Sequence, residues 1–278
     1  MDFRRPYTDQ SFFLIAGPCV LESRDHALFM AGQLRDLAES RGIPFIYKSS
    51  FDKANRTALS SYRGVSLEEG LDILAEVRTR FGVPVLTDVH ESHQCATVAD
   101  AVDVLQIPAF LCRQTDLLLA AAATGRTVNV KKGQFLAPWD LKHAVDKMRS
   151  VPDHGPLWVT ERGSTFGYGQ LVVDMQSFPY LRRNGCPVVF DATHSVQKPG
   201  ALGNATGGAR EMIPTLARAA ATAVDGFFFE VHDCPEKALS DGPNAMPLDA
   251  FGGLLDQLLA IWRASRQAAL NDPAGGES

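Results

Sequence analysis

Side chains able to do acid–base, metal or anion chemistry follow eight short apolar runs along the chain. Each run is rich in Val, Ile or Phe and ends at a polar residue. In chain order these residues are Cys19, Lys48, Asp88, Gln106, Lys131 with Lys132, Arg162, His194, and Glu230 with His232. A set this uniform predicts that the ends of the runs form one site.

One part of this set is basic. Its residues and the cations of the neighbouring loops are Lys48, Lys131, Arg162, Lys53, Arg56, Arg63 and Arg113. The whole chain carries a net charge of -5, so clustered cations indicate an anionic ligand. Arginine binds phosphate or carboxylate through two hydrogen bonds, and lysine binds it as a point charge. The alternative is that each loop cation is an ordinary solvated side chain.

The other part consists of Cys19, His194, Glu230 and, on the following loop, Asp241. Thiolate, imidazole and carboxylate together suit a divalent transition metal. Because these residues lie far apart in the sequence, the prediction depends on a fold that joins the first, seventh and eighth runs. The alternatives are a buried hydrophobic role for Cys19 and a structural one for His194. His90, His93 and His232 are competing ligands, and Cys95, Cys112, Cys186 and Cys234 are assigned to packing.

The elements that must position these residues alternate between strand and helix. The expected strands cover 12–18, 44–49, 84–89, 103–108, 127–132, 157–162, 187–193 and 226–232, and the expected helices cover 25–42, 66–82, 92–100, 113–124, 138–150, 174–185, 209–224 and 248–266. Short apolar runs are typical of strands buried on both faces. Repeated alternation predicts an α/β fold, a closed (β/α)8 TIM barrel, whose active site lies at the carboxyl ends of the strands. A doubly wound sheet is the alternative, but no GxGxxG follows the first strand.

The connections and the ends complete this outline. Ser66 and Glu69 form a capping box that predicts a helix start. The longest connections, 49–65, 195–208 and 233–247, are expected to be functional loops. We expect one domain over 1–278 with a disordered tail from about 268 to 278.

Composition limits the classes of function. A chain of 278 residues that is 45% hydrophobic buries a large core without disulfides. Five cysteines without a CxxC pair indicate reduced thiols in the cytoplasm. The net negative charge argues against a nucleic-acid partner. No apolar run approaches the roughly 18 residues of a membrane span, so we expect no membrane association.

Several segments carry a closer resemblance, and they occur in family order: "AGPCVLES", "YKSSFDKANRTALSSYRG", "TDVHE", "QIPAFLCRQTDLL", "VKKGQF", "FGYGQLVVDM", "DATHSVQ" and "EVHDCPEKALSDGPNAM". Over residues 10–265 the chain closely resembles the 3-deoxy-D-manno-octulosonate 8-phosphate synthases. The resemblance implies a (β/α)8 barrel, usually a homotetramer, that condenses phosphoenolpyruvate with D-arabinose 5-phosphate and releases inorganic phosphate. In that reaction water attacks C2 of the enolpyruvate, C3 attacks the aldehyde, and the C–O bond of the phosphate ester breaks. The product serves lipopolysaccharide biosynthesis in Gram-negative bacteria.

The resemblance also implies roles for individual residues. The phosphoenolpyruvate site comprises Lys53, Gln106, Ala109, Lys131 and Arg162, and the arabinose 5-phosphate site comprises Lys48, Asn55, Arg56, Thr57 and Asp88. Arg113 matches an arginine that reaches the sugar phosphate across a subunit interface. Two anions nearby would favour the charged form of Lys131, which makes it a candidate acid. His194, Asp241 and a metal-bound water are candidates for the base.

The family divides at the position of Cys19. Members with cysteine there need a divalent metal, and members with asparagine do not. The resemblance therefore implies one divalent ion per subunit, Mn, Fe, Co or Zn. Its ligands match Cys19, His194, Glu230 and Asp241.

Three alternatives remain open at this point. The related 3-deoxy-D-arabino-heptulosonate 7-phosphate synthases typically have a "KPRT" segment where this chain reads "KANRT". A Schiff-base aldolase would use Lys48 or Lys131 as its nucleophile. A non-enzymatic barrel that binds a sugar phosphate leaves the metal-type residues without a purpose.

Overall fold

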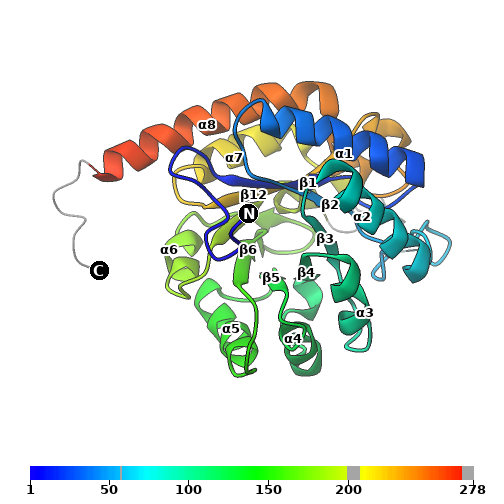
Figure 1. Ribbon diagram of the computed structural model, residues 1–278. Coiled ribbons are helices and arrows are strands. Elements are labelled where there is room, and N and C mark those ends of the chain that lie inside the picture. The colour runs from blue at the N-terminus through cyan, green and yellow to red at the C-terminus, as the bar shows by residue number, and fades with distance from the viewer. Residues whose placement is uncertain (57, 199–206, 271–278) are drawn as a thin grey trace.

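The main strands surround a common axis, with helices on the outside (Figure 1). The computed structural model describes residues 1–56, 58–198 and 207–270. Within these ranges the strands of the ring are β1 (Phe13–Gly17), β2 (Phe45–Lys48), β3 (Val85–Asp88), β4 (Val104–Ile107), β5 (Thr127–Lys131), β6 (Leu157–Glu161), β9 (Val188–Asp191) and β12 (Gly226–His232). They pair in parallel in this order, and β12 pairs back to β1. The predicted (β/α)8 barrel is confirmed.

Closure of the ring joins the two ends of the chain. Gly17 on β1 pairs with Glu230 on β12, and Leu14 pairs with Phe45 on β2. A Cβ atom on Gly17 would lie 1.9 Å from the backbone oxygen of Lys48. Only glycine therefore allows β1 to approach β2 this closely, at the pole where Cys19 follows.

Alternate side chains along the strands fill two cores. Phe13, Trp158 and Phe228 belong to the cluster inside the barrel, and Leu14 belongs to the larger cluster between strands and helices. At the amino ends of the strands, Phe3 packs against the inner cluster, and its carbonyl accepts a 2.8 Å hydrogen bond from Trp158 Nε1. The N-terminal segment thus covers one end of the barrel (Figure 1).

The outer helices are α1 (Arg24–Glu39), α2 (Leu67–Phe81), α3 (Gln94–Ala101), α4 (Thr115–Ala122), α5 (Lys142–Arg149), α6 (Ser177–Arg182), α7 (Ile213–Ala220) and α8 (Leu248–Leu270). Side chains cap the first two, as helix starts require. Ser23 accepts the His26 N–H, and Ser66 accepts the Glu69 N–H at 3.2 Å. Gly82 ends α2 in the left-handed conformation, at φ 64°.

Short elements that the sequence analysis did not predict occupy several connections. After β6, the strands β7 (Ser164–Thr165) and β8 (Leu171–Val172) form an antiparallel pair. Gly167 and Gly169, both at positive φ, lie in the turn between them. Because this hairpin uses the residues before it, α6 starts at Ser177, later than the expected 174.

Further short elements lie in other connections. They are η1 (Ala109–Leu111), η2 (Pro138–Leu141), η3 (His194–Val196), β10 (Gln197–Lys198), β11 (Gly207–Gly208), η4 (Arg210–Met212), η5 (Pro235–Lys237), η6 (Gly242–Asn244) and β13 (Met246–Pro247). Most of the expected loop 195–208 lies outside the described residues. Helix α8 continues to Leu270, past the expected start of the tail at 268, and 271–278 are not described. Among the described helices, none combines the length and the apolar character that crossing a membrane requires.

Candidate active site

A cavity of about 480 Å³ opens at the carboxyl ends of the barrel strands. Its lining includes both the predicted anion-binding and the predicted metal-binding types of residue. The predicted residues among them are Lys48, Lys53, Asn55, Arg56, Asp88, Gln106, Ala109, Lys131, Arg162, His194 and Asp241. The barrel therefore gathers side chains from six strand ends and two long loops around one pocket.

Three of the predicted metal ligands converge next to this cavity. Cys19, Glu230 and Asp241 each offer a ligand atom, and these atoms lie within 4.8 Å of one another. The pairing of β1 with β12 brings Cys19 close to Glu230. Gly17 is the residue that pairs with Glu230, and Cys19 follows Gly17 by two positions. Asp241 adopts φ 51° in the following loop, a conformation that aspartate tolerates better than most residues.

His194 reaches the same group from the end of β9. Its Nε2 lies 3.4 Å from Glu230 Oε1 and 3.8 Å from Asp241 Oδ2. Its Nδ1 lies 2.8 Å from Oδ2 of the buried Asp191, which assigns the Nδ1–H as donor to that carboxylate. The Nε2 lone pair then faces two carboxylates. This arrangement is the one that orients a histidine toward a metal ion.

Glu230 is the most confined of these groups. It is fully buried, and within the described part of the chain neither of its carboxylate oxygens has a hydrogen-bond partner. Burial raises its pKa, but the charges of His194, Lys53 and Lys48 outweigh burial and hold the pKa at about 2. A buried carboxylate that stays charged needs cations beside it, and in the free protein these are Lys48 Nζ at 3.5 Å and Lys53 Nζ at 3.6 Å.

Cys19 is buried, and its thiol donates a hydrogen bond to Ser240 Oγ at 3.2 Å. Burial, with a contribution from the negative charge of Glu230, raises the pKa of Cys19 to about 12. The thiol is therefore protonated at neutral pH unless a metal ion binds to the sulfur. One sulfur, one imidazole and two carboxylates fit a divalent transition metal, whose charge favours the thiolate.

Lys131 extends from β5 into the cavity. Its Nζ donates to Asp191 Oδ2 at 2.6 Å and lies 3.7 Å from the centre of the Phe228 ring. Burial lowers the pKa of Lys131, the charge of Lys48 adds to this, and Asp191 only partly offsets it. In the free protein, burial thus outweighs the attraction of one carboxylate, and the expectation that two bound anions favour the charged form of Lys131 stays a prediction.

Arg162 follows β6 and connects the two parts of the site. It is 5% exposed, and its Nη1 is buried without a hydrogen-bond partner among the residues that the structure describes. Its Nη2 donates to Gln197 Oε1, and Gln197 Nε2 donates to Asp241 Oδ2 at 2.8 Å. Gln197 therefore links the predicted anion clamp to a predicted metal ligand.

The loop after β2 contributes the remaining cations. Lys53 Nζ lies 3.6 Å from Glu230 Oε1, and Arg56 Nη1 donates to Ser240 Oγ at 2.6 Å. Asn55 is exposed at the cavity. Thr57, which we also expected to bind the sugar phosphate, lies outside the described residues.

Lys48 and Asp88 are joined through Ser50. Lys48 Nζ donates to Ser50 Oγ at 3.0 Å, and Ser50 in turn donates to Asp88 Oδ1. Asp88 Oδ2 lies 3.0 Å from His90 Nε2. Burial raises the pKa of Asp88, but His90 and the lysines outweigh burial and hold the pKa well below its usual range.

Other candidates lie outside this pocket. Arg113 is exposed beyond η1, and Arg63 pairs with Asp52; neither lines the cavity. Among the competing histidines, His93 is exposed, and His232 lies with Glu22 and His26 in a separate cluster. Of the cysteines assigned to packing, Cys95, Cys112 and Cys186 are buried and Cys234 is partly exposed.

Asp191, Gln197 and Ser240 also belong to the site, although they were not predicted from the sequence. Asp191 has a local signal, since it lies three residues before His194 at the end of an apolar run, but no sequence pattern shows that it also contacts Lys131. Gln197 and Ser240 have no such signal, because their partners come from other strands.

Comparisons with known proteins agree with this geometry. Residues 7–263 match the family model described as the DAHP synthetase I family. A protein from Cyanothece sp. named 2-dehydro-3-deoxyphosphooctonate aldolase is 61% identical over 253 residues, which cover 91% of this chain and 92% of the relative. Proteins of the same name from Nitrosococcus oceani and Synechococcus sp. are 59% identical (91% of this chain, 90% of the relative) and 56% identical (95% and 92%).

Proposed function

The chain belongs to the DAHP synthetase I family, and we propose that it is a 2-dehydro-3-deoxyphosphooctonate aldolase, which is a 3-deoxy-D-manno-octulosonate 8-phosphate synthase. It condenses phosphoenolpyruvate with D-arabinose 5-phosphate, takes up water and releases inorganic phosphate, for lipopolysaccharide biosynthesis. The observation that carries the proposal is the 61% identity with a relative of that name across 91% of the chain. It favours this activity over the heptulosonate alternative.

The charge of the cavity supports the binding of two phosphate esters. Lys48, Lys53, Lys131, Arg56 and Arg162 all line it. Cations in a partly desolvated pocket bind phosphate and carboxylate groups more strongly than surface cations do. We assign phosphoenolpyruvate to Lys53, Gln106, Ala109, Lys131 and Arg162. The buried Nη1 of Arg162, which has no partner among the described residues, supplies a donor for its phosphate or carboxylate.

The sugar phosphate occupies the other side of the cavity. We assign it to Asn55, Arg56 and Thr57, with Lys48 and Asp88 beside its hydroxyl groups. Arg56 is hydrogen-bonded to Ser240, so its guanidinium already points into the pocket. This placement brings the aldehyde end of the sugar toward Asp241 and His194.

Cys19, His194, Glu230 and Asp241 would hold one divalent ion, Mn, Fe, Co or Zn. When bound, such an ion polarises the sugar aldehyde or the attacking water. The fit rests on the sulfur, nitrogen and oxygen donor set and on the buried charge of Glu230. Asp191 holds the ring of His194 so that Nε2 faces the group.

Proton transfer falls to Lys131, His194 and Asp241. Burial lowers the pKa of Lys131, which eases release of a proton toward the oxygen that forms from the aldehyde. Asp191 accepts the hydrogen bond of Lys131 and so fixes the position of Nζ. The base is His194, Asp241 or a water molecule that they orient.

Assembly and location form a further part of the proposal. Phe110, Phe135, Phe166 and Tyr168 are at least half exposed, on connections after β4, β5 and β6. Exposed apolar surface of this kind marks a contact between proteins and supports a homotetramer in which Arg113 reaches the neighbouring subunit's sugar phosphate. Light scattering on the purified protein tests the tetramer. Two phosphorylated metabolites as substrates fit a cytoplasmic enzyme.

A chelation assay tests the function. Purified protein with phosphoenolpyruvate and arabinose 5-phosphate should release inorganic phosphate, and erythrose 4-phosphate should replace the pentose phosphate poorly. A chelator should abolish the activity, and Mn, Fe, Co or Zn should restore it. Full activity in metal-free protein contradicts the metal role. A covalent adduct after borohydride treatment supports the Schiff-base alternative instead.

A further inference from the structure

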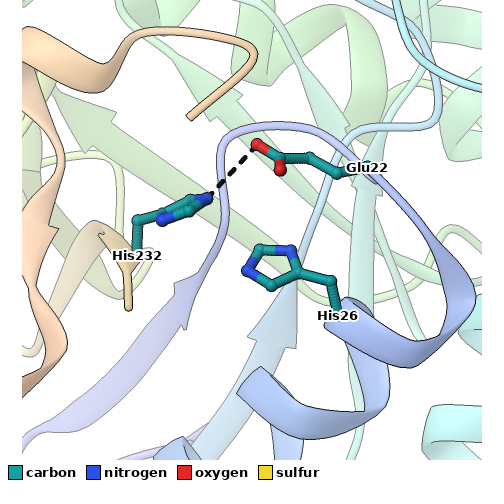
Figure 2. A group of neighbouring side chains, drawn as sticks. All are labelled: Glu22, His26 and His232. Atoms are coloured by element: carbon teal, nitrogen blue, oxygen red, sulfur yellow. Dashed lines mark hydrogen bonds and ion pairs between the residues drawn. The ribbon is translucent and has the colours of Figure 1, made fainter. Parts of the chain in front are cut away.

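A second group of metal-ligating side chains lies at the same pole of the barrel but does not line the cavity. Glu22, His26 and His232 each offer one ligand atom, and these atoms lie within 4.8 Å of one another. Figure 2 shows the carboxylate and the two imidazoles turned toward a common space. We propose that these three residues bind a second divalent transition metal ion, of the zinc class, that has a structural role.

The spacing of two of the donors already fits such an ion. His232 Nε2 lies 3.3 Å from Glu22 Oε1. Two ligands of a tetrahedral zinc ion, each at about 2.0–2.1 Å, are about 3.4 Å apart. Two imidazoles and a carboxylate are a common donor set for zinc. A water molecule completes four-fold coordination.

His26 presents a nitrogen lone pair to this space. Its Nε2 lies 3.0 Å from Asp233 Oδ1 and is assigned as donor to that carboxylate. Its Nδ1 then carries the lone pair, and this atom is buried without a hydrogen-bond partner within the described ranges. A buried acceptor without a donor costs free energy, and a cation between His26 and Glu22 removes that cost.

His232 needs one proton to move. Its Nδ1 accepts the N–H of Cys234 at 2.9 Å, which places the ring proton on Nε2, toward Glu22. A metal ion on Nε2 displaces that proton. The proton then moves to Nδ1, where Asp233 Oδ1, 3.0 Å away, accepts it, and the Cys234 N–H gives up its hydrogen bond to Nδ1. Asp233 therefore supports both imidazoles, as carboxylates do next to the ligands of metal sites.

The second ion would join two segments that also carry the predicted ligands of the active site. Glu22 follows Cys19 by three residues, and its Oε1 accepts the N–H of Leu239 at 2.9 Å. Leu239 precedes Asp241 in the loop after β12. An ion held by Glu22, His26 and His232 thus fixes the loop that positions Asp241. The site does not depend on the proposed function, because its occupancy is measured separately.

Zinc titration of the chelator-stripped protein tests the proposal. Calorimetry should count two zinc ions per wild-type chain. His26→Gln should lose the second ion and bind one, Cys19→Ser should lose the active-site ion and bind one, and the double variant should bind none. Cobalt distinguishes the two sites by spectroscopy. The sulfur-to-cobalt charge-transfer band should persist in His26→Gln, whereas Cys19→Ser should lose it and keep the visible bands of a nitrogen and oxygen site.

Matched variants make the test specific. His143→Gln, an exposed histidine on α5, should leave the count at two, and Asp233→Asn should weaken the second ion by about tenfold to a hundredfold. Glu22→Gln keeps an acceptor for Leu239 and repeats the test if His26→Gln does not fold. An ion count that falls in neither His26→Gln nor Glu22→Gln overturns the proposal.

Discussion

At the scale of single residues, burial and neighbouring charge decide what each group of the site can do. Cys19 and Glu230 lie side by side, yet burial keeps the first protonated, with a pKa of about 12, while nearby cations keep the second ionised, with a pKa of about 2. Asp191 contacts both Lys131 and His194. The chemistry of the pocket therefore depends on these pairs and not on the residue types alone.

The pKa of Cys19 makes metal binding dependent on pH. Below about pH 12 the thiol holds its proton in the free protein, so a metal ion that binds the sulfur must displace that proton. Because one proton is displaced, the apparent affinity for the metal ion should rise about tenfold for each unit of increase in pH across the neutral range, and fall by the same factor as pH decreases. Calorimetry in buffers of different ionisation enthalpy should show one more proton released by wild type than by Cys19→Asn. Equal release by the two proteins contradicts the ligand role of Cys19.

Arg56 should act on one substrate only. It lines the cavity and bonds to Ser240, so Arg56→Ala removes a charged contact to the sugar phosphate. A hydrogen bond to a charged group contributes about 1.5–3 kcal/mol. The KM for arabinose 5-phosphate should therefore rise about tenfold to a hundredfold, with little change in the KM for phosphoenolpyruvate. Steady-state kinetics measure both. Arg80→Ala, exposed on α2, is the control, and equal effects on both substrates refute the assignment.

At the scale of elements, buried polar side chains hold the connections around the site. Lys132 ends the β5 run and is fully buried. Its three N–H groups are shared among Ser164 Oγ, at 3.0 Å, and the carbonyl oxygens of Gly133, Leu136 and Gly163, at 3.3–3.4 Å. One ammonium group thus ties the connection after β5 to the hairpin β7–β8, which the apolar patterns did not predict.

Loss of this ammonium should loosen both connections. In Lys132→Met the buried acceptors lose their donor, and Glu161, 3.5 Å from Nζ, loses its counter-charge. Breaking a buried pair in this way lowers the free energy of unfolding by about 3 kcal/mol. Urea unfolding measures the change. Lys142→Met removes an exposed ion pair within α5 and should leave the free energy of unfolding almost unchanged. A similar change in the two variants would show that Lys132 does not stabilise the connections.

At the scale of the whole molecule, closure of the barrel creates the site. Contacts between β1 and β12 join residues about two hundred positions apart, and the same two segments carry both groups of metal-type side chains. The N-terminal segment covers the opposite end, where Phe3 and Tyr7 pack on the inner core. The pocket lies at the other pole, where the carboxyl ends of the strands meet.

Gly17 is the position where closure is most easily disturbed. In Gly17→Ala the new Cβ would lie 1.9 Å from the backbone oxygen of Lys48, so β1 must move away from β2. Overpacking against backbone should lower the free energy of unfolding by more than about 3 kcal/mol and weaken metal binding. Gly253 lies in α8, and a Cβ atom added there would have no atom within 4 Å. Gly253→Ala should therefore raise the free energy of unfolding by up to about 1 kcal/mol. Urea unfolding of both variants measures these changes. An unchanged free energy of unfolding in Gly17→Ala would show that closure does not require glycine at this position.

The sequence by itself determined the strands, most of the helices and the set of polar residues at the strand ends. These are local properties: an apolar run of the right length predicts a buried strand, and the residue that ends it must face the pole of the barrel. The positions of Lys131, Arg162, His194 and Glu230 follow from that rule. The hairpin after β6 does not follow from that rule, because it depends on glycines in its turn and not on a run of apolar residues.

Only the tertiary structure decided which of these side chains meet. It placed Cys19 with Glu230 and Asp241, gave His194 its support from Asp191, and grouped His232 with Glu22 and His26 instead of with the cavity. It also showed that burial lowers the pKa of Lys131 in the free protein. The physical reason is that ligand geometry and desolvation depend on neighbours from distant strands, and the pattern along a single run does not contain those neighbours.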